Sequence, residues 1–154
     1  MGGAILFVQT RPVEFLQLSW SDAMASKFNV RVGEPAGQTT WELLVLFLAL
    51  EVWGHEHRKT GLLLMGDNTA SLSATLSLKG KSALTQITKE IAWRKVRRGW
   101  RYAAGHLPSE MNSMADSLSR VSAPAGSESR SFPKELESAR QRDTPAWDSL
   151  WICS

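Results

Sequence analysis

Three acidic residues occupy positions that suit a catalytic site in an α/β protein. Glu42 lies in the first turn of the most apolar predicted helix, Asp67 follows a short apolar segment, and Asp116 lies in a short predicted helix. Carboxylates that converge at the carboxyl end of a strand bind hard cations such as Mg²⁺ or Mn²⁺, and a pair of these cations can stabilise both oxygens of a reacting phosphodiester. His106 lies ten positions before Asp116, and its imidazole could transfer a proton near neutral pH.

The same residues have simpler interpretations. Glu42 fits the last position of a capping box, and Asp67 fits an N-cap because a helical segment follows it. Asp116 and Arg120 are four residues apart, which is the spacing of a solvent-exposed ion pair on a helix. His106 fits an ordinary surface histidine in a loop. Spacing alone therefore leaves metal binding and purely structural roles open.

A basic segment at the end of a predicted helix is the second candidate functional feature. The chain carries a net charge of +3 with a pI near 9.3, which is compatible with an anionic partner such as nucleic acid. Trp93 and Trp100 are interleaved with the cations, so the alternative is an amphipathic helix with a solvated basic face and tryptophans in the core. The cations that would contact phosphates are Lys89, Arg94, Lys95, Arg97, Arg98 and Arg101.

A mixed α/β fold is needed to position these residues. Apolar alternation and a turn at Arg11-Pro12 predict a hairpin, and the later helical crossovers favour parallel strands, so helices would cover the faces of a mixed sheet. The expected elements are strands at 4–9, 13–20, 61–65 and 100–104, helices at 21–28, 39–59, 67–78, 82–98 and 111–120, and a loop at 105–110.

The C-terminal part differs in composition from the rest. Residues 1–120 are expected to form one domain, and residues 121–154 a Ser/Pro-rich linker and tail that is largely disordered, although 145–152 with its two tryptophans could dock back on the domain. The single Cys153 excludes an internal disulfide. The longest apolar run, 43–50, is too short to cross a bilayer, so we expect no membrane association and an intracellular location, either cytoplasm or nucleus.

Several segments resemble one family. Residues 105–120, GHLPSEMNSMADSLSR, resemble the ending His-[Ile/Val/Leu]-Pro-Gly-x-x-Asn-x-x-Ala-Asp-x-Leu-Ser-Arg of ribonuclease H domains in retroelement (retrotransposon) reverse-transcriptase polyproteins, with Ser109 where the family often has Gly. Residues 41–44 are similar to the family's helix that carries its second acidic residue. Residues 66–70 resemble its strand-to-helix step, and 1–7 resemble its second strand. The resemblance covers about residues 1–120.

The resemblance implies a fold and a set of roles. The fold would be a ribonuclease H-like mixed sheet with helices on both faces. Glu42, Asp67 and Asp116 would be three of the family's four metal-binding carboxylates, in a two-metal site for Mg²⁺ or Mn²⁺. His106 would be the loop histidine that assists proton transfer or product release. Asn68 would contact the nucleic-acid backbone, and the basic helix would help hold the duplex.

One departure from the family concerns the first strand. The family's fourth carboxylate is an Asp on the first and central strand, which should lie shortly before Gly2 and is absent from this sequence. We therefore expect an N-terminally truncated domain with an incomplete metal site. Without that strand, the hairpin at 4–20 should have an unpaired edge or move onto the strand at 62–65.

The resemblance implies a Mg²⁺-dependent endonuclease domain within a retroelement polyprotein. It would hydrolyse the RNA strand of RNA–DNA hybrids, with activity impaired by the absent carboxylate. Its partners would be the hybrid, or another nucleic acid, and the remainder of the polyprotein. The alternative is a catalytically dead retroelement remnant that keeps some affinity for nucleic acid through its basic helix.

Overall fold

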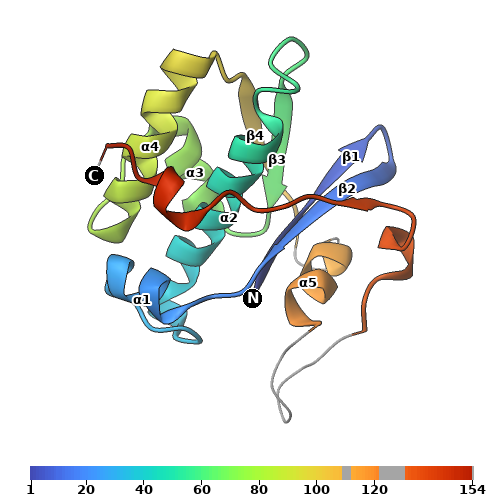
Figure 1. The fold of residues 1–154 in the computed structure, drawn as a ribbon, viewed down its shortest axis with the longest axis horizontal. Helices are drawn as coiled ribbons and strands as arrows, with labels where there is room; N and C mark the ends of the chain where they lie inside the picture. Colours follow the sequence, from blue (N-terminus) through green and yellow to red (C-terminus); the bar gives the residue numbers. More distant parts are fainter. Residues whose placement is uncertain (109–111, 122–130, 154) are drawn as a thin grey trace.

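The computed structural model describes residues 1–108, 112–121 and 131–153. Within these ranges the chain is a mixed α/β protein in which helices pack against two small sheets (Figure 1). The principal elements are β1 (Gly2–Val8), β2 (Arg11–Leu18), α1 (Asp22–Phe28), α2 (Gln38–Trp53), β3 (Leu62–Gly66), α3 (Thr69–Ser77), α4 (Ala83–Arg98), β4 (Tyr102–His106), α5 (Ser113–Arg120) and β5 (Arg140–Gln141). Short 3₁₀ turns lie at Pro35–Gly37, Lys134–Leu136 and Trp147–Leu150.

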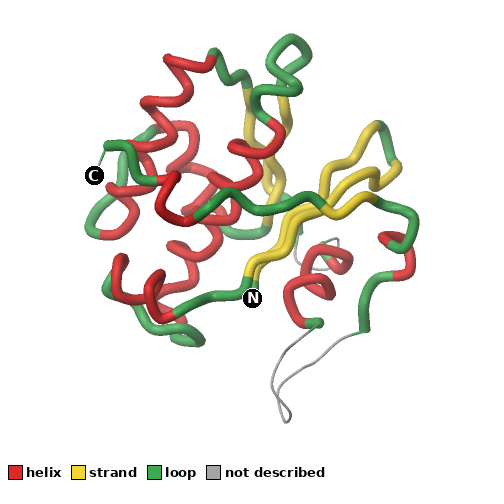
Figure 2. Tube along the Cα trace, viewed as in Figure 1, coloured by secondary structure: helices red, strands yellow, loops and turns green. Residues whose placement is uncertain are grey.

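The strands form two sheets that do not pair with each other in the part of the chain described. β1 and β2 form the expected antiparallel hairpin, and the short β5 pairs in parallel with β2. β3 and β4 pair in parallel from Leu62 opposite Tyr102 to Gly66 opposite His106. The expected mixed α/β class is therefore confirmed, with one three-stranded mixed sheet and one two-stranded parallel sheet (Figure 2).

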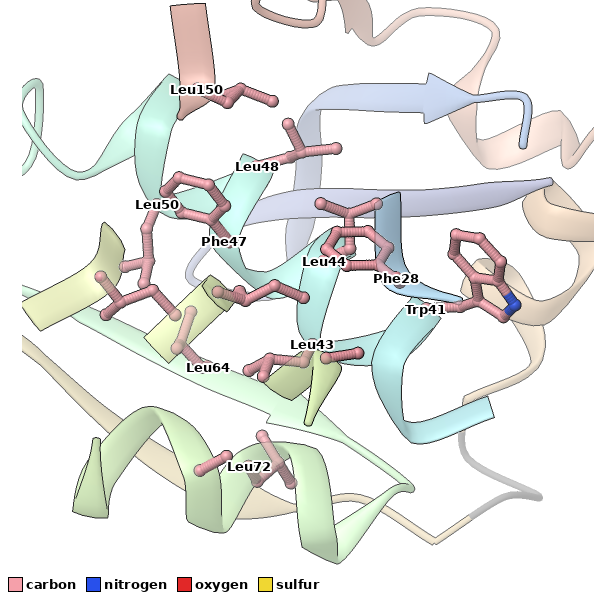
Figure 3. Close-up of a cluster of buried hydrophobic side chains, with 14 of the residues drawn as sticks. Phe28, Trp41, Leu43, Leu44, Phe47, Leu48, Leu50, Leu64, Leu72 and Leu150 are labelled. Carbon is pink, nitrogen blue, oxygen red and sulfur yellow. The ribbon is translucent and has the colours of Figure 1, made fainter. Parts of the chain in front are cut away.

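Helix α2 is the centre of the core (Figure 3). Its Leu43, Leu44, Phe47 and Leu50 are fully buried, as its apolar sequence predicts for a helix packed on several sides. The helix ends at Trp53, before the predicted end at residue 59. A side chain at the next position, Gly54, would collide with the Leu50 carbonyl and with Trp100, so close packing at this end favours glycine.

The hairpin has a helix on each face. Leu16 packs with α2 residues, and Leu6 and Leu62 lie against the same cluster, so α2 lies under both sheets. On the other face Phe15 packs with Leu118 of α5. Two sheets without shared hydrogen bonds are thus joined through the apolar surface of one helix.

The last predicted strand is shifted. It was expected at 100–104 but runs from Tyr102 to His106. Gly99, with φ of +66°, ends α4, and Trp100 turns into the core at 3% exposure. Hydrogen bonding to β3 then sets the strand's limits and includes His106, which was expected in a loop.

Residues 131–153 pack on the domain, which differs from the expectation of a largely disordered tail. β5 adds to β2, and Arg142 forms ion pairs with Glu14 and Glu56. Leu150 is 1% exposed and Trp151 packs against Phe47, so the segment crosses from the hairpin to the helices (Figure 1, orange to red). Its aromatic and aliphatic anchors bury enough surface to hold it, as the two tryptophans suggested.

The rest of the predicted linker, 122–130, lies outside the described residues, as do 109–111 of the resemblance segment. In the described ranges, no helix has both the length and the apolar character needed to cross a membrane.

Candidate carboxylate site

A cavity of about 520 Å³ brings the three predicted carboxylates together. It is lined by the start of β1, the first turns of α2, the residues after β3, and α5. Glu42, Asp67 and Asp116 come from three separate elements and all line this cavity. The predicted convergence of these residues on one site is therefore what the fold produces.

Asn68 fixes the position of Asp67. Its Oδ1 accepts a hydrogen bond from the Ser71 backbone N–H at 2.9 Å, which makes Asn68 the N-cap of α3. Its Nδ2 donates to Oγ1 of Thr39 at 3.3 Å and ties the start of α3 to the start of α2. The N-cap interpretation of Asp67 is thus wrong, because the cap is one residue later. A nucleic-acid contact by Asn68 stays a prediction, made by a side chain that already has these two partners.

Glu42 lies in the second turn of α2, not the first. The helix begins at Gln38 with Gly37 as its cap and without a side-chain capping bond, so the capping-box interpretation is wrong. Nε2 of Gln38 instead donates to Oε1 of Glu42 at 2.9 Å. Burial raises the pKa of Glu42 above its ordinary value, and the charges of Asp67 and Asp116 raise it further.

Asp116 forms the predicted helix ion pair. Its Oδ1 lies 3.0 Å from Nε of Arg120, and both side chains are partly exposed. The pair is part of the candidate site as well, because both residues line the cavity. Helix α5 is held in place by Leu118, which is fully buried against Gly3 and whose carbonyl accepts a hydrogen bond from Nε2 of Gln17 at 3.0 Å.

His106 lies near the carboxylates but outside the cavity lining. It is the last residue of β4, opposite Gly66, and its side chain is exposed. Asp67 follows Gly66 directly, so both residues lie at the same end of the β3–β4 sheet.

The predicted basic surface is divided by the fold. Arg94 is fully buried between Glu90 and Glu51, so its assignment as a phosphate contact is wrong. A full charge inside the core is stable only with such partners. Arg98 also pairs with Glu51, at 2.7 Å, and Nζ of Lys95 lies 4.8 Å from the Tyr102 ring centroid. The exposed members of the predicted set are Lys89, Arg97 and Arg101.

Arg101 and the carboxylate Asp67 lie at opposite ends of one sheet. Arg101 precedes β4, whereas Asp67 follows the parallel strand β3. Each strand has five residues, which separates the two ends by roughly 17 Å. A ligand that contacts both groups must extend along the sheet.

Three further cavity residues were not predicted from the sequence. Gln38 holds Glu42, and its i,i+4 spacing to that residue was an available signal. Trp20 and Trp41 stack with their ring centroids 4.7 Å apart and line the same cavity. No sequence signal paired these two tryptophans, because they lie on a loop and a helix that meet only in the fold.

Carboxylate oxygens are the ligands that Mg²⁺ and Mn²⁺ prefer, so the donor chemistry of the cavity fits a divalent cation. As arranged among the described residues, no group of three or more His, Cys, Asp and Glu side chains forms a ready metal site. Two of the carboxylates instead hold donors of the chain itself, Gln38 and Arg120. We found no match to this chain among protein-family models, curated proteins or solved structures.

Proposed function

We propose that the carboxylate cavity binds a divalent cation and that the chain is a ribonuclease H-like nuclease domain acting on the RNA strand of RNA–DNA hybrids. The observation that carries the proposal is the convergence of Glu42, Asp67 and Asp116 on one cavity. Burial is the main cause of the raised pKa of Glu42, and the charges of Asp67 and Asp116 add to it, as expected where acidic groups gather. The segments around these residues supply the family resemblance.

The roles follow from the chain's own contacts. Glu42, Asp67 and Asp116 would hold the cation, which when bound supplies positive charge to stabilise the phosphodiester during attack. Asn68, as the N-cap of α3, keeps Asp67 at the carboxyl end of β3. His106, exposed at the same end of the sheet, would exchange a proton with the leaving or attacking oxygen.

The finer fold is part of the proposal. A ribonuclease H-like sheet has a strand between the positions of β1 and β3. In the described residues β1 pairs only with β2 and β3 only with β4, so each has one edge available for such a strand. The cavity is lined by Gly2 and Gly3 on one side and Asp67 on the other. An acidic residue on a strand between them would be a fourth carboxylate, and we expect weak hydrolysis where it is lacking.

The proposed substrate class rests on charge and position. Lys89, Arg97 and Arg101 are exposed and can make sequence-independent phosphate contacts. A duplex that runs along β3 and β4 would contact Arg101 at one end and reach the carboxylates at the other. A hybrid duplex would be recognised by its shape and its 2′-hydroxyls, so we expect no sequence preference.

A catalytically inactive nucleic-acid-binding protein is the second candidate. It is favoured by the separation of Arg101 from the cavity, since duplex binding at Arg101 does not require the carboxylates. Both the nuclease and the binding protein would have two partners: a hybrid or another nucleic acid, and the remainder of a polyprotein.

A cleavage assay separates the two candidates. The chain is incubated with a hybrid labelled on each strand in Mg²⁺ or Mn²⁺, beside Asp67→Asn and the control Asp143→Asn, an exposed carboxylate of the C-terminal segment. RNA-strand cleavage that Asp67→Asn removes and Asp143→Asn keeps supports the nuclease. Hybrid binding in EDTA without cleavage in either metal supports the binding protein. Absence of binding at low salt contradicts both.

A further inference from the structure

Arg120 and its ion-pair partner Asp116 both line the carboxylate cavity. The Nε of Arg120 lies 3.0 Å from Oδ1 of Asp116, one helical turn earlier on α5, and both residues line the cavity with Glu42 and Asp67. Among the described residues that line the cavity, Arg120 has the one cationic side chain. It therefore shares the cavity with three carboxylates and is paired with one of them, Asp116.

The position of α5 is fixed independently of this ion pair. Leu118 lies midway between Asp116 and Arg120 in the sequence. Its side chain is fully buried and packs against Gly3 of β1. The Leu118 carbonyl also accepts the hydrogen bond from Gln17. The Arg120–Asp116 contact is consequently not the sole contact that seats the helix, and the two side chains are 38% and 33% exposed.

We propose that Arg120 is the internal counter-ion of the carboxylate cavity and competes with a divalent cation for Asp116. The proposal rests on the proposed function, because it concerns the same cation site. A carboxylate oxygen that accepts a hydrogen bond from a guanidinium has fewer lone pairs and a weaker field for a metal ion. Metal binding and the Arg120–Asp116 contact are therefore opposed, and each weakens the other by the same factor.

This competition gives Arg120 two effects on the protein. Without metal, it offsets the charge of Asp116, which is one of the two carboxylates that act on Glu42. When metal is supplied, it sets the concentration at which Asp116 is released to the cation. Arg120 is thus a positioning residue that governs the metal threshold without touching the substrate.

Calorimetric titration of the full chain with Mn²⁺ tests the proposal. Wild type is compared with Arg120→Gln, with Arg120→Lys, and with the matched control Arg31→Gln, which removes an exposed arginine paired with Glu34 three residues away. We expect the Kd for Mn²⁺ to fall on the order of tenfold in Arg120→Gln, within the usual range for coupled sites. Arg120→Lys should stay near the wild-type value because it keeps the charge, and Arg31→Gln should leave the value unchanged.

A second measurement uses the wild-type chain and does not depend on a folded variant. The ¹⁵N–¹H resonance of the Arg120 Nε is followed by NMR while Mg²⁺ is added. We expect it to shift and to exchange faster with solvent as the site fills, because the hydrogen bond to Asp116 is lost.

The outcomes separate this proposal from the proposed function. If wild type binds Mn²⁺ and Arg120→Gln binds it equally or more weakly, the competition is refuted and the metal site stands. An Arg120 Nε resonance that does not change at saturating Mg²⁺, or an equal gain in affinity in Arg31→Gln, also refutes it. If neither wild type nor Arg120→Gln binds Mn²⁺, the metal site fails and the competition fails with it.

Discussion

Replacing Arg94 by methionine tests whether the middle of α4 belongs to the core or to a nucleic-acid surface. The guanidinium is fully buried, contacts Glu51, lies 2.5 Å from Oε2 of Glu90, and donates to the Leu150 carbonyl at 3.0 Å. Methionine preserves much of the apolar volume but removes the charge. Glu90, itself fully buried, would then lack its cationic partner.

We expect Arg94→Met to destabilise the protein by about 3–5 kcal/mol, the usual cost of leaving one member of a buried ion pair uncompensated. For a domain of this size the loss corresponds to a fall in Tm on the order of 10 °C. Urea denaturation followed by circular dichroism and tryptophan fluorescence measures it. Adding Glu90→Gln should cost less in the Arg94→Met background than in wild type, because the two residues are coupled.

Arg97→Met is the matched control, because it removes an exposed arginine from the same helix. We expect it to change stability by no more than about 0.5 kcal/mol. If Arg94→Met is as stable as Arg97→Met, the buried ion-pair network is refuted. If Arg94→Met weakens hybrid binding and leaves stability unchanged, Arg94 contacts phosphate after all.

Three other outcomes are expected. The raised pKa of Glu42 means that its ionised form weakens the fold, so Glu42→Gln should stabilise the metal-free chain near pH 7. This gain should vanish as pH falls below the ordinary value of 4.5, where both side chains are neutral, and urea denaturation across pH measures it. Arg97→Gln and Arg101→Gln should each weaken hybrid binding and reduce the slope of log K against log salt by about 0.9 per lost phosphate contact, measured by fluorescence anisotropy. Leu150→Ala should cost about 2–5 kcal/mol, and the half-exposed Ile152→Ala much less, in thermal unfolding.

Local sequence patterns predicted those elements whose formation depends mainly on nearby residues. The apolar sequence of α2 indicated a core helix, and the two apolar runs indicated the β1–β2 hairpin. The turn predicted at Arg11-Pro12 is wrong, because both residues pair within the hairpin and the chain turns at Gln9 and Thr10. The limits of β4 could not be read this way, because pairing with β3 decides that His106 belongs to the strand. The C-terminal segment was placed outside the domain because its composition is polar, although Trp147 and Trp151 were its available anchors.

The site divides in a similar way. The sequence placed Asp67 after β3 and Asp116 on α5, and the fold brings them to one cavity with Glu42. It did not reveal the partner of Arg94 on α2, because Glu51 lies 43 positions earlier and reaches α4 only through helix packing. Exposure within a basic segment depends on such tertiary contacts, so the charge pattern alone overestimated the phosphate-binding surface.

Manganese broadening of backbone NMR signals tests the central claim most directly, because it locates the cation without requiring activity. Substoichiometric Mn²⁺ is added to the ¹⁵N-labelled chain, and the amide signals are followed residue by residue. We predict that Glu42, Asp67 and Asp116 lose intensity first and together, and that Asp67→Asn removes this loss. Uniform broadening, or loss centred on other acidic residues such as Asp143, would contradict a cation site in this cavity.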